Sequence, residues 1–518
     1  MIWRRTAAFV TAAFLAADAC ALSGAGNPWE TIDDAVCAGL VMQDYSGTIG
    51  AQTEITAAAR VAAEGNLPGH CRVTATIAPS IGVEVRMPIT GWTQRFLFTG
   101  CGGLCGIINS AGGDDALRRG YAVATTDMGH RAGSTDDRSW TSDKALVEDF
   151  NHRASHLTVV LAKLVIAAYY GKGPDKSYSR GCSTGGRQGL TSALMYPEDF
   201  DGIIAGAPAA DMATPHNAWS YLSNLDAAGR SILDAAAISL VQKTVLAACD
   251  ANDGVADGIV GDPLACNFDP QILQCGAVNG ASCLSAAQVA GVRRMYDGAK
   301  NSSGKPFYAM GYARGSEGGW TRSMVGEADK PPGRAGSAKF FLASVVGPTA
   351  KPSDFDFAKH GVKGGPLSAR LDQGDDNTRL APFAGRGGKI LMYHGWSDVD
   401  VTPSVSLDFR RAAISGLGGD MVDSFLRLFF MPGMGHCRGG PGADTADFLS
   451  AIEAWIEHGV APGALVTAKT TLPVRNYNDY PLSNDTVAFT RKAVPHPAVA
   501  VYSGTGSPDD SSNWSPKR

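Results

Sequence analysis

Short apolar runs alternate with longer amphipathic stretches along the first part of the chain. Runs rich in apolar and β-branched residues are typical of buried strands, and the periodic apolar stretch 156–170 predicts a helix. The predicted strands are residues 83–88, 95–99, 121–127, 176–180 and 202–206. We expect the first two to pair through a turn at Gly91 and Trp92, after an N-terminal cover over 26–80 with one strand at 73–77. Repeated strand and helix units predict a mostly parallel sheet covered by helices.

This alternation stops at about residue 211. From there to about residue 380 the chain is rich in Ala, Gly, Asp and Ser, and it predicts helices near 216–248 instead of strand and helix units. The strand pattern returns at 389–395 and 425–430, and a helix is expected at 444–458. An insertion between two strands of such a sheet lies over the carboxyl edge where ligands bind, so we expect it to form a lid.

Both ends of the chain fall outside this pattern. The first five residues include two arginines, an apolar run follows over 6–17, and small residues surround Ala19, which together are typical of a secretory signal peptide over 1–19. The run is too short to anchor stably in a bilayer, so no membrane span is expected. We expect a secreted or periplasmic protein, with lipid attachment at Cys20 as the open alternative. The Gly-, Ser-, Asp- and Pro-rich tail after about residue 503 is expected to be disordered.

Composition narrows the class of protein. The chain has 518 residues, of which 44% are hydrophobic and 18% are charged, as in globular proteins that fold around a core. Its formal net charge at pH 7 is -5, and its Lys and Arg residues form no cluster or stripe. Both observations disfavour nucleic acid as a partner.

A G-x-S-x-G motif at 181–185 joins the strand at 176–180 to an apolar helix. Small residues on both sides of the central serine permit a sharp strand–turn–helix bend that exposes its hydroxyl group, so Ser183 is the candidate nucleophile. Backbone N–H groups at the start of the helix would point to the place where an oxyanion forms. A second glycine-rich loop, over 100–106, follows a strand and suits the same task, although a disulfide-pinned turn explains it equally well.

A serine nucleophile needs a base, and the base needs an orienting carboxylate. In α/β hydrolases the three follow the chain order serine, acid, histidine. Asp398 follows the strand at 389–395, and His436 follows the strand at 425–430, so both lie at carboxyl strand ends. Asp400 is a competing acid that lies farther from its strand, and His130 also ends a strand but precedes the acid in the chain.

These positions predict an α/β-hydrolase fold with a large lid inserted between late strands of the sheet. We expect a discontinuous catalytic domain over 20–210 and 381–518, and a lid over 211–380. A length of 518 residues suits this division, because a single core rarely grows beyond about 300 residues.

Eleven cysteines and the expected export make disulfides the default. Without Cys20 the number is even, and proximity along the chain favours neighbouring pairs, although spacing alone leaves the connectivity open. The suggested pairs are Cys101 with Cys105, Cys249 with Cys266, Cys275 with Cys283, Cys37 with Cys71, and the remaining Cys182 with Cys437. The last pair would clamp the neighbour of Ser183 to the neighbour of His436, because bonded cysteines hold their Cα atoms about 4.4–6.8 Å apart. We expect this bond to preorganise the base.

The loop 249–259 concentrates carboxylates and turn glycines. Closely spaced hard oxygen ligands suit Ca²⁺, although Gly254 at the fifth position and the missing glutamate at the twelfth depart from the EF-hand pattern. The predicted ligands of a structural calcium ion are the side chains of Asp250, Asp253 and Asp257 and the carbonyl groups of Val255 and Ile259. A solvated acidic turn is the alternative.

Together these segments resemble the tannase and feruloyl esterase family of secreted serine esterases, which also includes terephthalate monoester hydrolases. The resemblance rests on 181–187, 394–398, 435–437 and 250–259, and it covers nearly the whole mature chain. It implies a disulfide beside the catalytic triad, calcium in the lid and no organic cofactor. It also implies oxyanion donors at the matching positions, which are Thr184, Gly102 and Gly103.

Two departures from the family concern the tail and the lid. Many relatives carry a further cysteine pair near the C-terminus, whereas no cysteine follows Cys437, and the lid looks shorter than in the terephthalate ester hydrolases. Candidate substrate contacts are His394, Arg314 and Trp320. An arginine suits a substrate carboxylate and a tryptophan suits an aromatic acyl group, but packing or surface positions explain the lid residues as well.

The sequence therefore predicts a carboxylic ester hydrolase that acts on small aromatic esters. Feruloyl or other hydroxycinnamoyl esters come first, followed by galloyl esters and then terephthalate monoesters. From other classes, a secreted binding protein on a hydrolase scaffold that has lost catalysis, or a peptidase, stays open.

Overall fold

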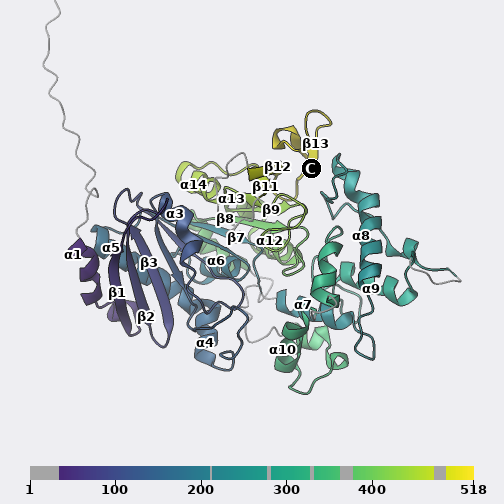
Figure 1. Ribbon diagram of the computed structural model, residues 1–518, viewed down its shortest axis with the longest axis horizontal. Helices are drawn as coiled ribbons and strands as arrows, with labels where there is room; N and C mark the ends of the chain where they lie inside the picture. The colour runs from purple at the N-terminus through teal and green to yellow at the C-terminus, as the bar shows by residue number, and fades with distance from the viewer. Residues whose placement is uncertain are drawn as a thin grey trace, which may run out of the picture.

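The computed structural model describes residues 34–210, 213–276, 282–326, 332–361, 377–471 and 486–517. The predicted signal peptide over 1–19 and Cys20 lie outside these residues. Figure 1 shows two parts side by side, a sheet flanked by helices and, on the right, a largely helical segment that the chain inserts between β7 (Gly202–Gly206) and β8 (Lys389–Gly395).

Within the described residues, a nine-stranded sheet has the order β1-β2-β3-β5-β4-β6-β7-β8-β9. The strands from β5 through β4 to β9 run parallel, whereas β1, β2 and β3 add an antiparallel side. The bounds are β1 (Thr53–Val61), β2 (His70–Ile77), β3 (Ile81–Pro88), β4 (Arg95–Thr99), β5 (Ala122–Thr126), β6 (Lys176–Cys182), β7 (Gly202–Gly206), β8 (Lys389–Gly395) and β9 (Leu426–Met431). This architecture confirms the predicted α/β class.

Two predictions about the N-terminal side are wrong. β3 and β4 do not pair with each other, because β3 lies between β2 and β5 while β4 lies between β5 and β6. Every residue of β3 is buried, as expected for a strand with neighbours on both sides. The segment before β3 is also more than a cover, since β1 and β2 extend the sheet itself.

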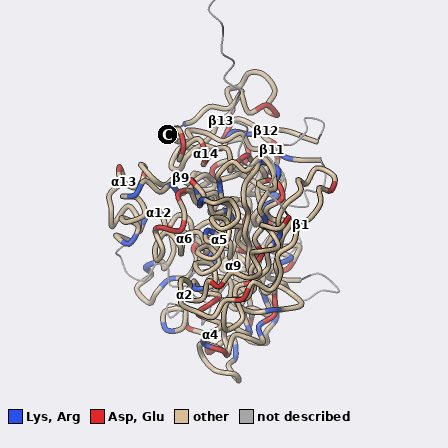
Figure 2. The backbone as a smooth tube through the Cα atoms, turned by 90° about the vertical axis from the view of Figure 1, so that its left-hand side faces the viewer, with Lys and Arg blue, Asp and Glu red and all other residues tan. Residues whose placement is uncertain are grey.

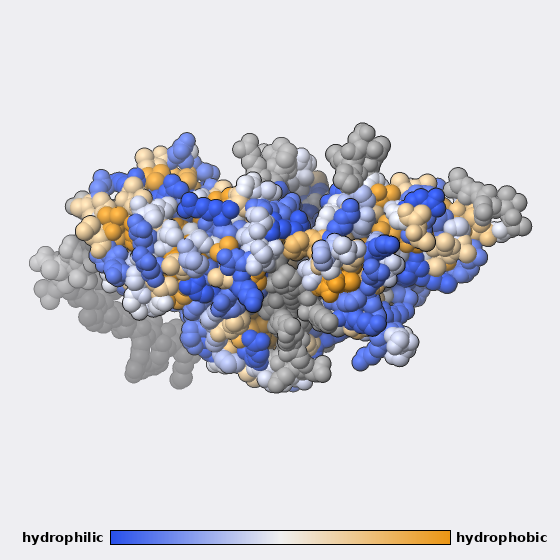
Figure 3. Space-filling model, turned by 90° about the horizontal axis from the view of Figure 1, so that it is seen from below, coloured by the Kyte–Doolittle hydropathy of each residue, from blue (hydrophilic) through white to orange (hydrophobic). Residues whose placement is uncertain are grey.

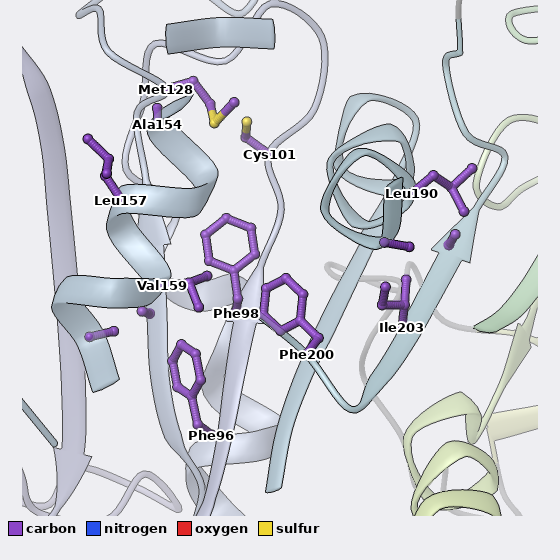
Figure 4. Packing of buried hydrophobic residues seen from close by; sticks show 14 of the residues in the cluster. Phe96, Phe98, Cys101, Met128, Ala154, Leu157, Val159, Leu190, Phe200 and Ile203 are labelled. Atoms are coloured by element: carbon purple, nitrogen blue, oxygen red, sulfur yellow. The ribbon is translucent and has the colours of Figure 1, made fainter. Parts of the chain in front are cut away.

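Helices cover both faces of the sheet. Alternate strand residues point to opposite faces, so Phe96 and Phe98 join one core cluster with α5, α6 and α12, whereas Leu97 joins another with α3 and α14. Figure 4 shows Phe96, Phe98 and Phe200 packed beside Val159 of α5. The helices outside the insertion are α1 (Asp34–Gly39), α2 (Ser46–Ile49), α3 (Asp114–Arg118), α4 (Lys144–Glu148), α5 (Ala154–Tyr170), α6 (Thr184–Met195), α12 (Ser404–Leu417), α13 (Gly419–Phe425) and α14 (Phe448–His458).

The insertion between β7 and β8 has a hydrophobic core of its own. We call residues 211–380 the inserted segment. Its main cluster gathers apolar side chains from α8 and α9 around Tyr312 and Trp320, and Val399 from the loop after β8 packs against it. The helices that the chain forms between β7 and β8 are α7 (Ala213–Ser223), α8 (Ala235–Cys249), α9 (Ala286–Asp297), α10 (Ala335–Val345) and α11 (Ala381–Gly385).

The C-terminal part forms two small sheets. One joins β10 (Thr445–Ala446), β11 (Leu465–Thr470) and β12 (Val487–Ala493), and the other pairs β13 (Val499–Tyr502) with β14 (Trp514–Lys517). The prediction of a disordered tail is therefore wrong. Although the tail is polar in composition, its backbone is hydrogen-bonded in the β13–β14 pair. The buried Trp514 ring adds an apolar contact.

The surface is mixed in charge and in hydropathy. Acidic and basic residues intermingle along the tube in Figure 2, and hydrophobic residues occur in small groups among hydrophilic ones on the face seen in Figure 3. Among the described residues, no helix combines the length and apolar character that a bilayer crossing requires.

Candidate active site

Ser183 stands at a sharp turn between β6 and α6. Its φ of 61° and ψ of -123° lie in a region that side chains rarely adopt, and its N–H group donates to the carbonyl oxygen of Gly206 at 2.9 Å. A Cβ atom at Gly181 would lie 2.5 Å from the backbone carbon of Gly185, and one at Gly185 would lie 3.1 Å from the carbonyl oxygen of Cys101. The glycines of the motif are therefore required by close backbone approach, as predicted.

The loop after β4 lies against this turn. The Thr184 hydroxyl donates to the carbonyl oxygen of Gly103 at 2.6 Å, and the Cys101 N–H group donates to the Gln188 side chain at 3.3 Å. Gly102 and Gly103 are exposed, so their backbone is accessible next to the serine turn. No role for Gln188 was predicted from the sequence, although its side chain accepts this bond and so helps to hold the loop against α6.

Asp398 and His436 form a hydrogen-bonded pair. The Nδ1 atom of His436 lies 2.7 Å from Oδ2 of Asp398, and because a carboxylate only accepts, Nδ1 carries the proton. The N–H groups of Asp400 and Val401 each donate to Oδ1 of Asp398 at 2.8 Å. The carboxylate is fully buried, so these bonds fix its place at the end of β8.

Charge and burial act in opposite directions on this pair. Burial disfavours the charged form of both groups, but the positive charge of His436 and hydrogen bonds from two histidines hold the pKa of the Asp398 carboxyl well below its usual range. Burial lowers the pKa of His436, yet the charge and hydrogen bond of Asp398 outweigh it and raise that pKa above its ordinary value. The pair is suited to stabilise a positive imidazolium.

The structure forms all five predicted disulfides. The bond between Cys182 and Cys437 spans 255 residues and holds the two Cα atoms 5.9 Å apart. Since these cysteines flank Ser183 and His436, the bond joins the end of β6 to the loop that follows β9. The strands β6 to β9 run parallel, so the carboxyl ends of β6, β8 and β9, which precede Ser183, Asp398 and His436, lie at one edge of the sheet.

The competing acid, Asp400, faces the inserted segment. Its carboxylate accepts from Arg322 at 3.1 Å and from Arg334 at 3.4 Å, and its carbonyl oxygen accepts from Asn217 at 2.7 Å. Asp400 therefore ties the loop after β8 to the inserted segment, whereas Asp398 contacts the histidine.

The side chains of the three candidate substrate contacts all bond to other groups of this chain. Trp320 is fully buried in the core of the inserted segment, and its Nε1–H group donates to the Ser316 hydroxyl at 3.1 Å. Arg314 donates to the carbonyl oxygen of Phe268 at 3.1 Å and lies over a tyrosine ring. His394 is also fully buried. The structure does not bring these side chains together around Ser183.

A cavity of about 430 Å³ opens beside His436. The loop after β8 contributes Ser397, Val399 and Asp400 to its wall, and the inserted segment contributes Gln242 and Arg322. The cavity therefore lies between the two parts of the molecule, with the imidazole on its wall.

The predicted calcium loop brings carboxylates close together. Burial and the charges of Asp257 and Asp250 raise the pKa of Asp253 to about 6. Asp257 Oδ1 is buried without a hydrogen-bond partner, and such an orphaned oxygen fits a cation. Asp250 accepts three backbone N–H groups, and Arg491 donates to Asp257 Oδ2 at 2.8 Å. Within the described ranges, no three His, Cys, Asp or Glu side chains converge as a ready metal site, so calcium binding stays a prediction.

Comparison with known proteins gives the site a context. The sequence pattern of the family described as tannase and feruloyl esterase matches residues 65–516. An uncharacterized esterase of Xanthomonas campestris is 34% identical, with 93% of this chain and 91% of that protein covered. The mono(2-hydroxyethyl) terephthalate hydrolase of Piscinibacter sakaiensis is 32% identical, with 88% and 86% covered. The crystal structure of feruloyl esterase B from Aspergillus oryzae has a TM-score of 0.77 at 27% identity, with 90% of this chain and 97% of that one covered.

Proposed function

Because the chain belongs to the tannase and feruloyl esterase family and is a carboxylic ester hydrolase, we propose that it cleaves esters of aromatic acids with Ser183, His436 and Asp398 as its catalytic triad. One observation carries the proposal. The Asp398–His436 pair, at 2.7 Å, is joined to the serine turn by the Cys182–Cys437 disulfide. This link supports the assignment of Asp398 as the acid, His436 as the base and Ser183 as the nucleophile.

The proposed reaction begins when Oγ of Ser183 attacks the ester carbonyl carbon. Nδ1 of His436 is bonded to Asp398, so Nε2 is the nitrogen that takes the serine proton. The tetrahedral intermediate then expels the alcohol, which receives that proton from Nε2, and an acyl-enzyme remains on Ser183. Water attacks the acyl-enzyme while Nε2 takes its proton, and collapse of this second intermediate returns the proton to Ser183 and frees the acid.

Backbone N–H groups are the proposed oxyanion donors. Thr184 is the first residue of α6, where N–H groups have no partner within the helix. Gly102 and Gly103 lie on the neighbouring loop, which the Thr184 hydroxyl holds in place at 2.6 Å. A rigid donor pair of this kind stabilises charge that develops only during the reaction.

For the acyl group, hydroxycinnamoyl esters such as feruloyl esters lead the proposal, followed by galloyl esters and terephthalate monoesters. Similarity to a feruloyl esterase B and to a mono(2-hydroxyethyl) terephthalate hydrolase supports aromatic acids as the class. We assign the inserted segment the role of a lid, since it forms one wall of the cavity beside His436.

Export and calcium complete the proposal. Five disulfides suit an oxidising compartment, in agreement with the expected signal peptide. Asp250, Asp253 and Asp257, with the carbonyl groups of Val255 and Ile259, would hold the calcium ion. The ion would neutralise clustered carboxylates and stabilise the loop, and no step of ester cleavage runs through it.

The test is a kcat/KM panel on methyl ferulate, methyl gallate and a terephthalate monoester, with Ser183→Ala as the blank. We expect methyl ferulate to lead by about tenfold or more, which corresponds to about 1.4 kcal/mol of transition-state discrimination. A higher kcat/KM for one of the other two esters would assign the enzyme to that substrate class instead. Equal rates for the enzyme and its blank on all three esters would contradict the triad and favour a binding protein, and a peptide substrate in the same panel covers the peptidase alternative.

A further inference from the structure

We propose that His394 is a positioning residue for this reaction, and that its Nε2–H group aims the Asp398 carboxylate at His436. This inference rests on the proposed function. It assigns His394 a role through another residue, in place of the substrate contact that its position in the sequence suggested.

The hydrogen bonds of His394 determine where its proton lies. Nε2 lies 2.8 Å from the carbonyl oxygen of Val401 and 3.2 Å from Oδ2 of Asp398. Both oxygens only accept, so Nε2 must carry a proton. Its single N–H group makes the shorter bond to the carbonyl oxygen of Val401 and has Oδ2 of Asp398 as its second, longer acceptor. Nδ1 lies 2.8 Å from the Ser406 hydroxyl, which can donate to it. All polar atoms of the ring therefore have partners, and the side chain is fully buried.

The geometry shows what this donor adds to the carboxylate. Two backbone N–H groups already hold Oδ1 of Asp398. Oδ2, which accepts from His436 at 2.7 Å, has its second side-chain donor in His394. With Oδ1 fixed alone, the carboxylate can still rotate about the bond to its Cβ atom, and Oδ2 would leave the line to His436. The imidazole of His394 removes this freedom.

The donor is itself held by two elements. Val401 belongs to the loop after β8, and Ser406 lies in the first turn of α12, so the ring cannot turn without breaking bonds to both. A donor fixed in this way meets the requirement that a catalytic group be supported by locked neighbours. A misplacement of about 1 Å in such a group can cost about 10²-fold in rate.

The test compares two substitutions of nearly equal shape. His394→Gln keeps a side-chain N–H donor near the position of Nε2, whereas His394→Met has none. We expect His394→Met to lower kcat about 10²-fold with KM within about twofold, and His394→Gln to recover at least about tenfold of that loss. Met392→Ala, on the same strand but outside the site, lowers stability and leaves kcat unchanged, so it controls for damage to the core.

The pH profile of kcat/KM gives a readout that a purely structural role would not move. The base must be neutral, so activity falls as pH drops through the pKa of His436, which the charge of Asp398 raises. A misaimed Oδ2 weakens that effect, so the acid limb of His394→Met moves to lower pH while that of His394→Gln stays. The other charges near this pair are Asp400, Arg334, Arg322 and Arg438, and all four are unchanged in both variants.

The outcomes separate this inference from the proposed function. Activity that survives in Ser183→Ala overturns the proposed function itself. Two results with an inactive Ser183→Ala would show that only the positioning role is wrong. In the first, His394→Met keeps the kcat and the acid limb of the wild type. In the second, the kcat of His394→Met falls no further than that of His394→Gln. Should His394→Met not fold, Ser406→Ala serves in its place, because it frees the ring at Nδ1. There we expect kcat to fall about five- to tenfold at unchanged KM, and an unchanged kcat overturns the inference.

Discussion

The edge of the sheet and the inserted segment use their polar side chains differently. At the sheet edge, Asp398 and His436 lie in the loops that follow two different strands and bond to each other. In the inserted segment, Arg314 and Trp320 bond to backbone and side-chain groups of that same segment. The first arrangement joins distant parts of the chain around a reactive group, and the second stabilises one local core.

This difference shows where the function of a polar residue can be predicted from the sequence. A polar residue at a carboxyl strand end is placed by the sheet, so its position along the chain predicts its neighbours. An aromatic or basic residue in an irregular segment has no such frame. Asp400 connects the two regions, because its carboxylate binds Arg322 and Arg334 while its N–H group supports Asp398.

The largest expected effect separates the two acids at the junction. Asp398→Asn should lower kcat/KM by about 10⁴-fold, because the amide cannot stabilise the imidazolium and favours the wrong tautomer of His436. Asp400→Asn should cost less than about tenfold, since the substitution removes charge pairs with the exposed Arg322 and the buried Arg334 but, within the described residues, no hydrogen bond to the imidazole. Steady-state kinetics on one aryl ester decides, and the reverse ranking would make Asp400 the catalytic acid.

The next effect compares one disulfide from each region. The bond between Cys182 and Cys437 closes 255 residues, whereas the bond between Cys275 and Cys283 closes eight. Chain entropy predicts that replacing both cysteines by alanine costs about 5.5 kcal/mol of unfolding free energy for the first pair and about 2.5 kcal/mol for the second. Urea unfolding under oxidising conditions measures both, and equal losses would show that loop closure is not the main contribution.

Substitutions at Trp320 test whether this side chain is part of the core of the inserted segment or a substrate contact. Trp320→Ala should cost about 3–5 kcal/mol of stability, because a fully buried indole leaves a cavity in the core. Trp320→Phe should cost less and leave KM within about twofold, since it keeps an aromatic ring. A raised KM in Trp320→Phe at unchanged stability would instead identify a substrate contact.

Calcium binding should give the smallest effect on stability. All predicted ligands of the ion lie in the loop 249–259 of the inserted segment. Closely packed carboxylates around Asp253 repel one another, so a bound ion at 100-fold excess over its Kd should add about 2.7 kcal/mol of stability. Asp253→Asn should abolish the rise in Tm that calcium produces, whereas Asp262→Asn, outside the predicted ligand set, should keep it. The site prediction fails if wild-type Tm is the same in calcium and in a chelator.

Sequence patterns predicted the sheet edge well and the partners of its strands poorly. Ser183 was identified because its turn needs glycines at fixed offsets, which is a local requirement. The partners of β3 and β4 depend on contacts distant along the chain, so adjacency suggested a hairpin that does not form.

Which side chains of the inserted segment are buried could not be predicted from the sequence for a similar reason. Trp320 follows Gly318 and Gly319 in a stretch without helical or strand periodicity, so no pattern showed which way its ring points. The role of His394 also required coordinates, because its bonds to Val401 and Ser406 form only when the loop after β8 folds back. Position along the chain placed His394 at a strand end and suggested a substrate contact, but it gave no sign of these bonds.

The central claim is that Ser183 carries the acyl group during ester cleavage. The most direct measurement is peptide mapping by mass spectrometry after a slowly hydrolysed aryl ester is mixed with enzyme and quenched in acid. The account predicts an added acyl mass on the peptide that contains Ser183, formed within one turnover and missing in Ser183→Ala. An acyl group on another residue, or turnover with no acylated peptide in the wild type and in the slow Asp398→Asn variant, would contradict it.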